Sequence, residues 1–314
     1  MIELKFTSHN SPEVPLSKYH KQWGDMLEER SGGRVKVTEY WSESLLKLSE
    51  VYRGTQTGIT DIGYYVVGTD PGMTELNRFQ RLPFLGFPSM EIGTEIYKQI
   101  WDKFPEVRNE FKGMKAFGQR MMPPYQLHMV KDVVRVPADL KGKKIIARAE
   151  WATVMQNVGA APLDLGPGDW YMTLERGLGE GHFVHFPAIM ALKTLELLPY
   201  HTIFGDGGCG MAMDMWLMNE DTWNSLPPDI QQIINDLEPW LKKTEIDQEY
   251  SYINMILDTA KKMNHTFTNL TPEEIALWKD AAKVTHEEWI NKNASRGAQQ
   301  IYDEVMRLEK QLSP

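Results

Sequence analysis

A glycine-rich segment is the first pattern in the sequence that could serve chemistry. Gly205-Asp-Gly-Gly-Cys-Gly210 matches GxGxxG, which holds a dinucleotide pyrophosphate where the turn opens a helix and presents its first amides. The residues that follow, Met211–Met218, alternate in hydropathy as a strand does. The pattern therefore favours a glycine-rich loop beside a strand over a nucleotide site.

Two histidines form the second such pattern. His182 and His185 stand three residues apart on a segment with the character of a strand. Zinc proteases place two histidines at i and i+4 of one helix, so that both face the same way. On a strand, residues three apart point to opposite faces. The spacing favours one imidazole facing a pocket and the other packed in the structure, and it predicts no metal site.

No catalytic signature accompanies these patterns. The single cysteine, Cys209, has no activating partner nearby in the sequence. The GxSxG nucleophile elbow, the P-loop and the Cys/His spacings of zinc sites are missing. We therefore expect no catalytic residue, cofactor or metal, although an active site assembled from distant segments stays open.

Composition narrows the class of protein. The 314 residues are enough for two lobes of ordinary domain size. Hydrophobic residues make up 42% and charged residues 25%, as in a globular protein. No apolar run reaches the ~18 residues that span a membrane. A net charge of −9 without a basic cluster argues against a nucleic-acid partner.

The elements that must position these residues alternate between strand and helix. Strands are predicted at 4–8, 34–40, 61–67, 114–122, 144–148, 160–165 and 182–186, with amphipathic helices between several of them. This alternation predicts α/β lobes with largely parallel sheets. From about Met218 the pattern turns helical, and Thr271, Pro272 and Glu274 form a capping box at the start of a late helix.

A series of segments, in order over nearly the whole chain, points to a known family. The segments are 29–37, 58–63, 81–85, 137–145, 159–162, 169–171, 176–181 and 218–228, of which Pro137-Ala-Asp-Leu-Lys-Gly-Lys-Lys-Ile145 is typical. Together they resemble the DctP-type substrate-binding proteins of tripartite ATP-independent periplasmic (TRAP) transporters.

The resemblance implies an α/β fold of the periplasmic-binding-protein type, a two-lobed clamshell with a long bridging helix and a helical C-terminal tail. Lobe I would comprise residues 1–123 with 212–248, and lobe II residues 124–211 with 249–314, with the ligand in the cleft between them. The resemblance also implies a monomer in the bacterial periplasm that delivers a small organic acid to TRAP membrane subunits and is no enzyme. A signal peptide would then be absent from this sequence, which begins with a strand-like segment.

Two other classes of function stay open at this point. An α/β enzyme acting on a small acid would use the histidines or Cys209 and would turn its substrate over. A periplasmic sensor domain would share the clamshell and bind its ligand unchanged, as a transporter component does.

The position that binds the ligand carboxylate in the family has changed in this chain. Members hold the carboxylate with an arginine four residues after the Lys-Gly of Asp-Leu-Lys-Gly, and Ile146 stands there. Arg148 lies two residues later, on the same face of a strand and just before a predicted helix at Glu150. Because a guanidinium pairs with a carboxylate through two parallel hydrogen bonds, we predict Arg148 as the clamp. A surface ion pair is its alternative role.

Other ligand-binding positions of the family also differ. Gln126 replaces a second arginine, Val66 a polar residue and Val184 an asparagine, while the N-terminal contact position is His9. These positions carry fewer charges and more apolar surface. Because unpaired buried polar groups are costly, an apolar wall favours an apolar ligand surface.

The predicted ligand is a monocarboxylate with a hydrophobic or aromatic body, such as a branched 2-oxo acid or an aryl acid. His9 and His182 would donate to its carboxylate or to a hydroxyl. The candidate walls, for each of which a place in the core is the alternative, are Tyr64, Tyr65, Trp151, Phe183, Phe186, Met213 and Trp216.

Overall fold

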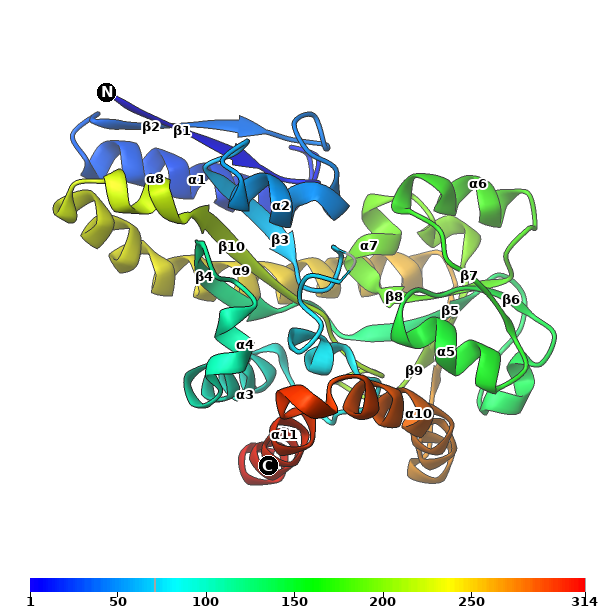
Figure 1. Cartoon of the computed structure of the whole chain (residues 1–314). Helices are drawn as coiled ribbons and strands as arrows, with labels where there is room; N and C mark the ends of the chain where they lie inside the picture. The colour runs from blue at the N-terminus through cyan, green and yellow to red at the C-terminus, as the bar shows by residue number, and fades with distance from the viewer. Residues whose placement is uncertain (71, 314) are drawn as a thin grey trace. The chain divides into compact units, whose positions relative to one another are not determined.

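The computed structural model describes residues 1–70 and 72–313, which form two compact units (Figure 1). Unit 1 comprises Met1–Arg78, Tyr97–Met122 and Ala212–Glu249, and unit 2 comprises Phe79–Ile96, Pro123–Met211 and Tyr250–Pro314. Each unit has its own sheet and buried core, which confirms the predicted α/β fold class. No helix of the described residues is both long and apolar enough to cross a membrane.

The sheet of unit 1 has the strand order β2-β1-β3-β10-β4. The strands are β1 (Ile2–Thr7), β2 (Val35–Tyr40), β3 (Ile62–Val66), β4 (Met114–Met121) and β10 (Met213–Asn219). β1 runs parallel to β2 and β3, whereas β10 is antiparallel to β3 and β4. Every residue of β3 and β10 is buried, as expected of central strands covered on both faces.

The helices of unit 1 pack against this sheet. They are α1 (Pro15–Arg30), the 3₁₀ turn η1 (Leu48–Glu50), α2 (Val51–Gln56), α4 (Pro105–Asn109) and α8 (Glu220–Ser225). α1 contacts β2, and α2 contacts β3 and β10. Three further elements have residues in both units: η2 (Asn77–Arg81), α3 (Met90–Lys103) and α9 (Pro228–Lys262).

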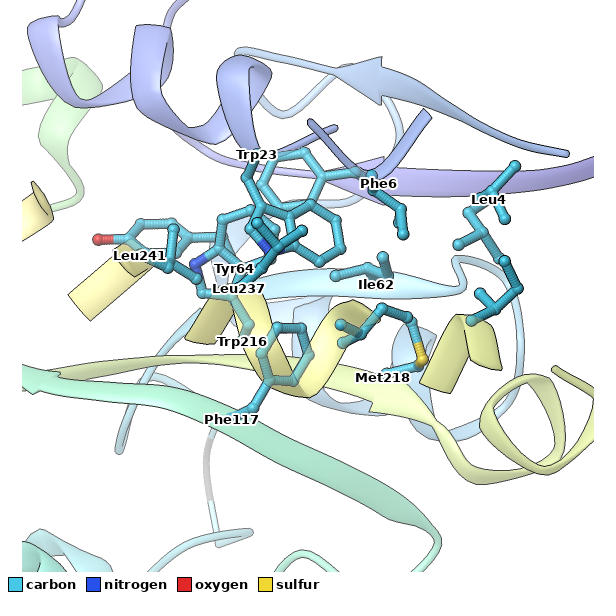
Figure 2. Close-up of a cluster of buried hydrophobic side chains, with 14 of the residues drawn as sticks. Leu4, Phe6, Trp23, Ile62, Tyr64, Phe117, Trp216, Met218, Leu237 and Leu241 are labelled. Atoms are coloured by element: carbon cyan, nitrogen blue, oxygen red, sulfur yellow. The ribbon is translucent and has the colours of Figure 1, made fainter. Parts of the chain in front are cut away.

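Aromatic rings meet around Trp216 in the core of unit 1, as Figure 2 shows. The centroid of the Trp216 indole lies 4.6 Å from the ring of Phe6, 4.9 Å from Trp23 and 5.8 Å from Phe117. Each such aromatic contact adds about 0.5–1.5 kcal/mol to the stability that burial provides. The rings come from β10, β1, α1 and β4, so this cluster fixes α1 on the sheet.

One buried arginine of β4 lies beside three carboxylates in the same unit. The guanidinium of Arg120 is 2.9 Å from Asp214 Oδ2, 3.0 Å from Glu245 Oε2 and 3.6 Å from Glu249 Oε1. Tyr64 donates its hydroxyl to Asp214 Oδ2 at 2.5 Å. Burial alone would lower the pKa of Arg120, but the carboxylates raise it well above its usual value.

One guanidinium cannot neutralise all three carboxylates. Burial raises the pKa of Asp214 to about 8 and that of Glu249 to about 7, against the attraction of Arg120. Burial also acts to raise the pKa of Glu245, but Arg120 and His20, whose Nε2 lies 2.9 Å from Glu245 Oε1, hold it below its usual value. Glu245 is therefore the lasting anion of the cluster, and Asp214 and Glu249 titrate near neutral pH.

The sheet of unit 2 has the strand order β11-β9-β5-β8-β6-β7. The strands are β5 (Tyr125–Met129), β6 (Lys144–Ile146), β7 (Ala161–Leu163), β8 (Gly181–His185), β9 (Tyr200–Ile203) and β11 (Thr266–Asn269). β5 is antiparallel to β8 and β9, and the other neighbours are parallel.

Both sheets are thus mixed, where the sequence predicted largely parallel sheets. The reversed strands are β10 in unit 1 and β5 in unit 2. Each is the first strand after the chain passes from one unit into the other, at Met211–Ala212 and at Met122–Pro123. The alternation of strand and helix along the sequence does not show in which direction the chain enters a sheet after it has passed from one unit into the other.

Helices cover the sheet of unit 2, and a core lies on each of its faces. The helices and 3₁₀ turns are η3 (Pro137–Leu140), α5 (Glu150–Asn157), η4 (Pro167–Asp169), α6 (Trp170–Glu175), α7 (Phe186–Ala191), η5 (Leu195–Leu197), α10 (Pro272–Lys292), η6 (Ala294–Arg296) and α11 (Ala298–Leu312). One core contains Trp151, Phe183 and Trp278. The other contains Ile146 and Val184.

The predicted capping box at the start of α10 is confirmed. Thr271 Oγ1 accepts a hydrogen bond from the Glu274 amide at 3.3 Å, and Glu274 Oε2 accepts one from the Thr271 amide at 2.8 Å. Two donors that the first turn would otherwise leave unpaired are satisfied in this way.

We expect Thr271→Ala to lower the free energy of unfolding by about 1 kcal/mol, because the N-cap acceptor is lost. Chemical denaturation of the purified protein measures this change. Thr259→Ala, in the interior of α9, is the control and should cost nothing, since alanine is the better helix former there. Equal effects of the two substitutions would contradict a capping role.

The Arg120 cluster predicts how stability depends on pH. In the unfolded chain Asp214 and Glu249 ionise near pH ~4, but in the folded protein they hold their protons up to about 8 and about 7. The folded state then binds more protons, so the free energy of unfolding falls as the pH rises through this window. The buried histidines have the opposite effect. The pKa values of His9 and His128 are lowered to about 4, so the free energy of unfolding decreases on their account only as the pH falls below ~6.5.

We therefore expect Glu249→Gln to flatten the decline in unfolding free energy between about pH 5 and 7, by roughly 1 kcal/mol per pH unit, because the proton that the folded state holds and the unfolded state has lost in this range is removed. Urea unfolding of both proteins at several pH values measures the slope. Glu3→Gln, at an exposed position of β1, is the control that leaves the slope unchanged. A variant with the wild-type slope would show that Glu249 is ionised throughout this range.

Candidate functional site

Arg148, the predicted carboxylate clamp, lies in a sharp turn between β6 and α5. The turn is made by Ala149, whose φ of 53° is unusual for a residue with a side chain and costs on the order of 1 kcal/mol. The side chain of Arg148 is 43% exposed, and its Nε lies 3.1 Å from Asp164 Oδ1. The guanidinium is thus accessible to solvent and is paired with a carboxylate that is itself 66% exposed.

A second arginine and a tyrosine lie near the same turn. Arg81 Nε is 3.3 Å from Oε2 of Glu150, the first residue of α5, and both side chains are largely buried. Burial raises the pKa of Tyr125, while the charges of Arg81 and Arg148 lower it. Two guanidiniums and one hydroxyl therefore surround the start of α5, a combination that suits an anionic oxygen.

The sequence analysis missed Arg81 and Tyr125 as candidate site residues. Arg81 begins the Arg81–Leu85 segment that contributed to the family resemblance, and Tyr125 precedes the candidate Gln126. Neither position stood out by its spacing, because the two residues meet Arg148 only through the fold of unit 2.

Ile146 and Gln126 occupy the two positions where the family has arginines. Ile146 is fully buried in a core cluster with Val184. The Gln126 amide is used by the backbone: Nε2 donates to the Gly205 carbonyl at 3.2 Å, and Oε1 accepts from the Phe204 amide at 2.9 Å. Gln126 holds the chain after β9 against β5, and its contact with a ligand stays a prediction.

The candidates on and beside β8 are divided between the two faces of the sheet. Phe183 stacks on Trp151 with ring centroids 4.4 Å apart and an angle of 11° between the planes. His182 points the other way, with its ring edge-on to Trp170 at 4.2 Å, and Val184 and Phe186 are buried on that face. The structure therefore brings Trp151 and Phe183 together and separates them from the rest.

A row of three imidazoles extends over neighbouring strands of unit 2, from His128 on β5 to His265 just before β11. His128 Nδ1 is 2.8 Å from His201 Nδ1, and His201 Nε2 is 3.0 Å from His265 Nδ1. Burial lowers the pKa of His201 to about 2 and that of His182 well below its usual value. These rings are neutral, and the described residues include no group of three or more His, Cys, Asp or Glu arranged to hold a metal ion.

In unit 1, His9 stacks on Tyr64 with ring centroids 5.6 Å apart and 14° between the planes. Burial, and to a lesser degree His20, lowers the pKa of His9 to about 4, so the ring is neutral. Its Nδ1 is buried and has no hydrogen-bond partner in the part of the chain that the structure describes. His9 therefore keeps one ring nitrogen for another partner, on a support fixed by the Arg120 cluster.

The other candidates of unit 1 are parts of the protein interior. Met213 and Trp216 of β10 are fully buried, and Val66 is 7% exposed at the end of β3. Tyr65 lies on the face of β3 opposite to Tyr64, where its hydroxyl is 3.0 Å from Thr74 Oγ1. Their contact with a ligand remains a prediction.

Cys209, the nucleophile of the enzyme alternative, is buried. Its Sγ lies 3.2 Å from the Tyr125 carbonyl oxygen, to which the thiol donates. Burial raises the pKa of the thiol well above its usual value. A protonated, enclosed thiol is a poor nucleophile.

Comparison with known proteins gives the family of the chain. A model of the DctP family, described as bacterial extracellular solute-binding protein, family 7, matches residues 6–293. A monocarboxylate 2-oxoacid-binding periplasmic protein of Nostoc sp. is 24% identical over 300 residues, 91% of this chain and 78% of that protein. The protein YiiZ of Salmonella typhimurium is 26% identical over 219 residues, 67% of this chain but only 64% of that protein.

A solved structure shares the fold over the full length. It is a TRAP solute-binding protein from a marine metagenome, specific for aromatic acid ligands and bound to metahydroxyphenylacetate, with a TM-score of 0.91, 21% identity and 100% coverage of both chains. The family match extends over nearly the whole sequence and agrees with the fold of both units. This chain belongs to the DctP family, the bacterial extracellular solute-binding proteins of family 7.

Proposed function

We propose that the protein is a monomeric binding protein of the bacterial periplasm, which captures a small organic acid and delivers it to TRAP membrane subunits. The family is one of transporter substrate-binding proteins, and relatives are named for 2-oxo acids and for aromatic acids. Binding without turnover also suits a buried, protonated Cys209.

The observation that best supports this proposal is the group of Arg148, Arg81 and Tyr125 at the start of α5. Arg148 lies two residues after the position of the family's arginine, and its exposed pair with Asp164 is of the kind that contributes only ~0–1 kcal/mol. A ligand carboxylate can therefore replace Asp164 at little cost. Two parallel hydrogen bonds from the guanidinium would then fix the orientation of the ligand.

The proposed ligand is a monocarboxylate with a hydrophobic or aromatic body. Ile146, Val184 and Val66 place aliphatic side chains where the family has charged or polar ones, so a sugar acid would leave its hydroxyls unpaired. The neutral rings of His9 and His182 each have a buried Nδ1 without a partner among the described residues, and each suits a single hydroxyl or keto oxygen. Branched 2-oxo acids and aryl acids meet both conditions.

We expect Arg148→Ala to abolish the stabilisation that such acids give. A ligand at ~100 times its dissociation constant should stabilise the wild-type protein by about 2.7 kcal/mol, which a thermal-shift assay with phenylacetate, mandelate and 2-oxoisovalerate detects. Arg135→Ala is the matched control, since Arg135 is also about half exposed, at 45%, and also paired with a carboxylate in unit 2. Stabilisation by glucuronate alone would contradict the apolar pocket, and an Arg148→Ala protein that binds normally would contradict the clamp.

Asp164→Asn should have the opposite effect on affinity. Removing this carboxylate frees the Arg148 guanidinium, so affinity for the acid should rise up to about fivefold, the equivalent of an exposed ion pair. Isothermal titration calorimetry measures the change. Asp280→Asn, which breaks an exposed pair with Lys283 on α10, is the control without effect. Weaker binding by Asp164→Asn would mean that Asp164 supports the ligand rather than competing with it.

A further inference from the structure

A pocket of about 220 Å³ lies wholly within unit 2, and none of its lining residues was singled out by the sequence analysis as a ligand contact. It is lined by the Leu82–Pro88 segment, by the loop that ends at Met211, and by Ile275 and Lys279 of α10. Its apolar wall includes Leu82, Phe84, Leu85, Phe87, Phe204 and Ile275. An apolar cavity of about 150 Å³ is enough to bind benzene, so this pocket accommodates a molecule of one ring with a substituent.

Glycines of the GxGxxG segment build one wall of the pocket. A Cβ atom on Gly207 would lie 2.1 Å from the Phe87 carbonyl oxygen, and one on Gly208, at a φ of 63°, would lie 2.3 Å from the Tyr125 carbonyl oxygen. The Phe84 amide also donates to the Cys209 carbonyl at 2.8 Å. This wall is therefore formed by closely packed backbone, and the pocket exists before a ligand arrives.

Gln80 is the polar group inside this apolar lining. Gln80 is one of the lining residues, although it is only 1% exposed. Neither Oε1 nor Nε2 has a hydrogen-bond partner in the part of the chain that the structure describes. A buried amide whose oxygen and nitrogen both lack a hydrogen bond destabilises the protein. Such a group indicates a partner that binds from outside the chain.

The chemistry of that partner follows from the carboxamide. Its oxygen accepts and its nitrogen donates along one edge, so the complementary group presents a donor and an acceptor side by side, as a primary amide or a lactam does. Lys279, at an exposed position of α10, lines the same pocket, and its ammonium is a donor for the second lone pair of a carbonyl oxygen. The apolar wall accepts a ring.

We propose that this pocket is a second ligand site, which binds a small ring compound with a carboxamide or lactam edge. The edge pairs with Gln80, and the ring lies against Phe84, Phe87 and Ile275. The site shares no lining residue with the Arg148 group, although Gly208 packs against the backbone of Tyr125.

Calorimetric titration with benzamide tests the proposal. We expect one molecule to bind the wild-type protein, and Gln80→Leu to weaken binding at least about tenfold, because two hydrogen bonds are lost. Gln80→Leu should bind toluene better than the wild type does, since it replaces an unpaired amide with apolar surface. Ile275→Trp, which fills the pocket from α10, should abolish binding of benzamide in a protein that melts normally.

Arg148→Ala separates this site from the organic-acid site, and it should leave benzamide binding unchanged. Equal affinity of Gln80→Leu and the wild type for benzamide would overturn the proposal. So would a crystal soaked in benzamide that shows only ordered water at the Gln80 amide. Loss of benzamide binding in Arg148→Ala would assign the ligand to the organic-acid site and would likewise overturn it.

Discussion

The charge of Arg120, buried without any exposed surface, governs the arrangement of unit 1. Its carboxylate partners join β4 to β10 and α9, and through Asp214 and Glu245 the network extends to Tyr64 of β3 and His20 of α1. Removing one partner of a buried pair costs about 3–5 kcal/mol, so these elements cannot move independently. Tyr64 is thereby held rigid beneath the ring of His9, and the free nitrogen of that ring has a fixed position.

Arg148 of unit 2 differs from Arg120 in its exposure to solvent. Arg148 keeps 43% of its side chain in solvent, and it is paired with Asp164, whose side chain is 66% exposed. A buried guanidinium surrounded by carboxylates is structural, because no ligand can replace those partners without exposing a charge to an apolar interior. An exposed guanidinium beside a displaceable carboxylate, with Arg81 and Tyr125 nearby, can exchange partners. Burial thus distinguishes the two arginines, although both form ion pairs: Arg120 is structural, and Arg148 is the clamp of the proposed ligand site.

Local patterns predicted the parts of the fold that depend on neighbouring residues. The capping box of Thr271 and Glu274 and the strand after Gly210 both follow from spacings of a few residues. The Arg120 cluster was not predicted, because its partners lie 94 to 129 positions further along the chain, at Asp214 and Glu249. For the same reason the meeting of Arg81 with Glu150, 69 positions away, had no local signal.

The glycine-rich segment shows why a matching pattern does not decide function by itself. A pyrophosphate needs amides that point into open space at the start of a helix. In Gly205–Gly210 the Gly208 amide donates to the Gly205 carbonyl and the Cys209 amide to the Tyr125 carbonyl, and the next element is the strand β10. Gly207 and Gly208 are required because two stretches of backbone approach more closely than any Cβ allows. The same residue type that admits a phosphate in one fold therefore admits a neighbouring chain segment in this one.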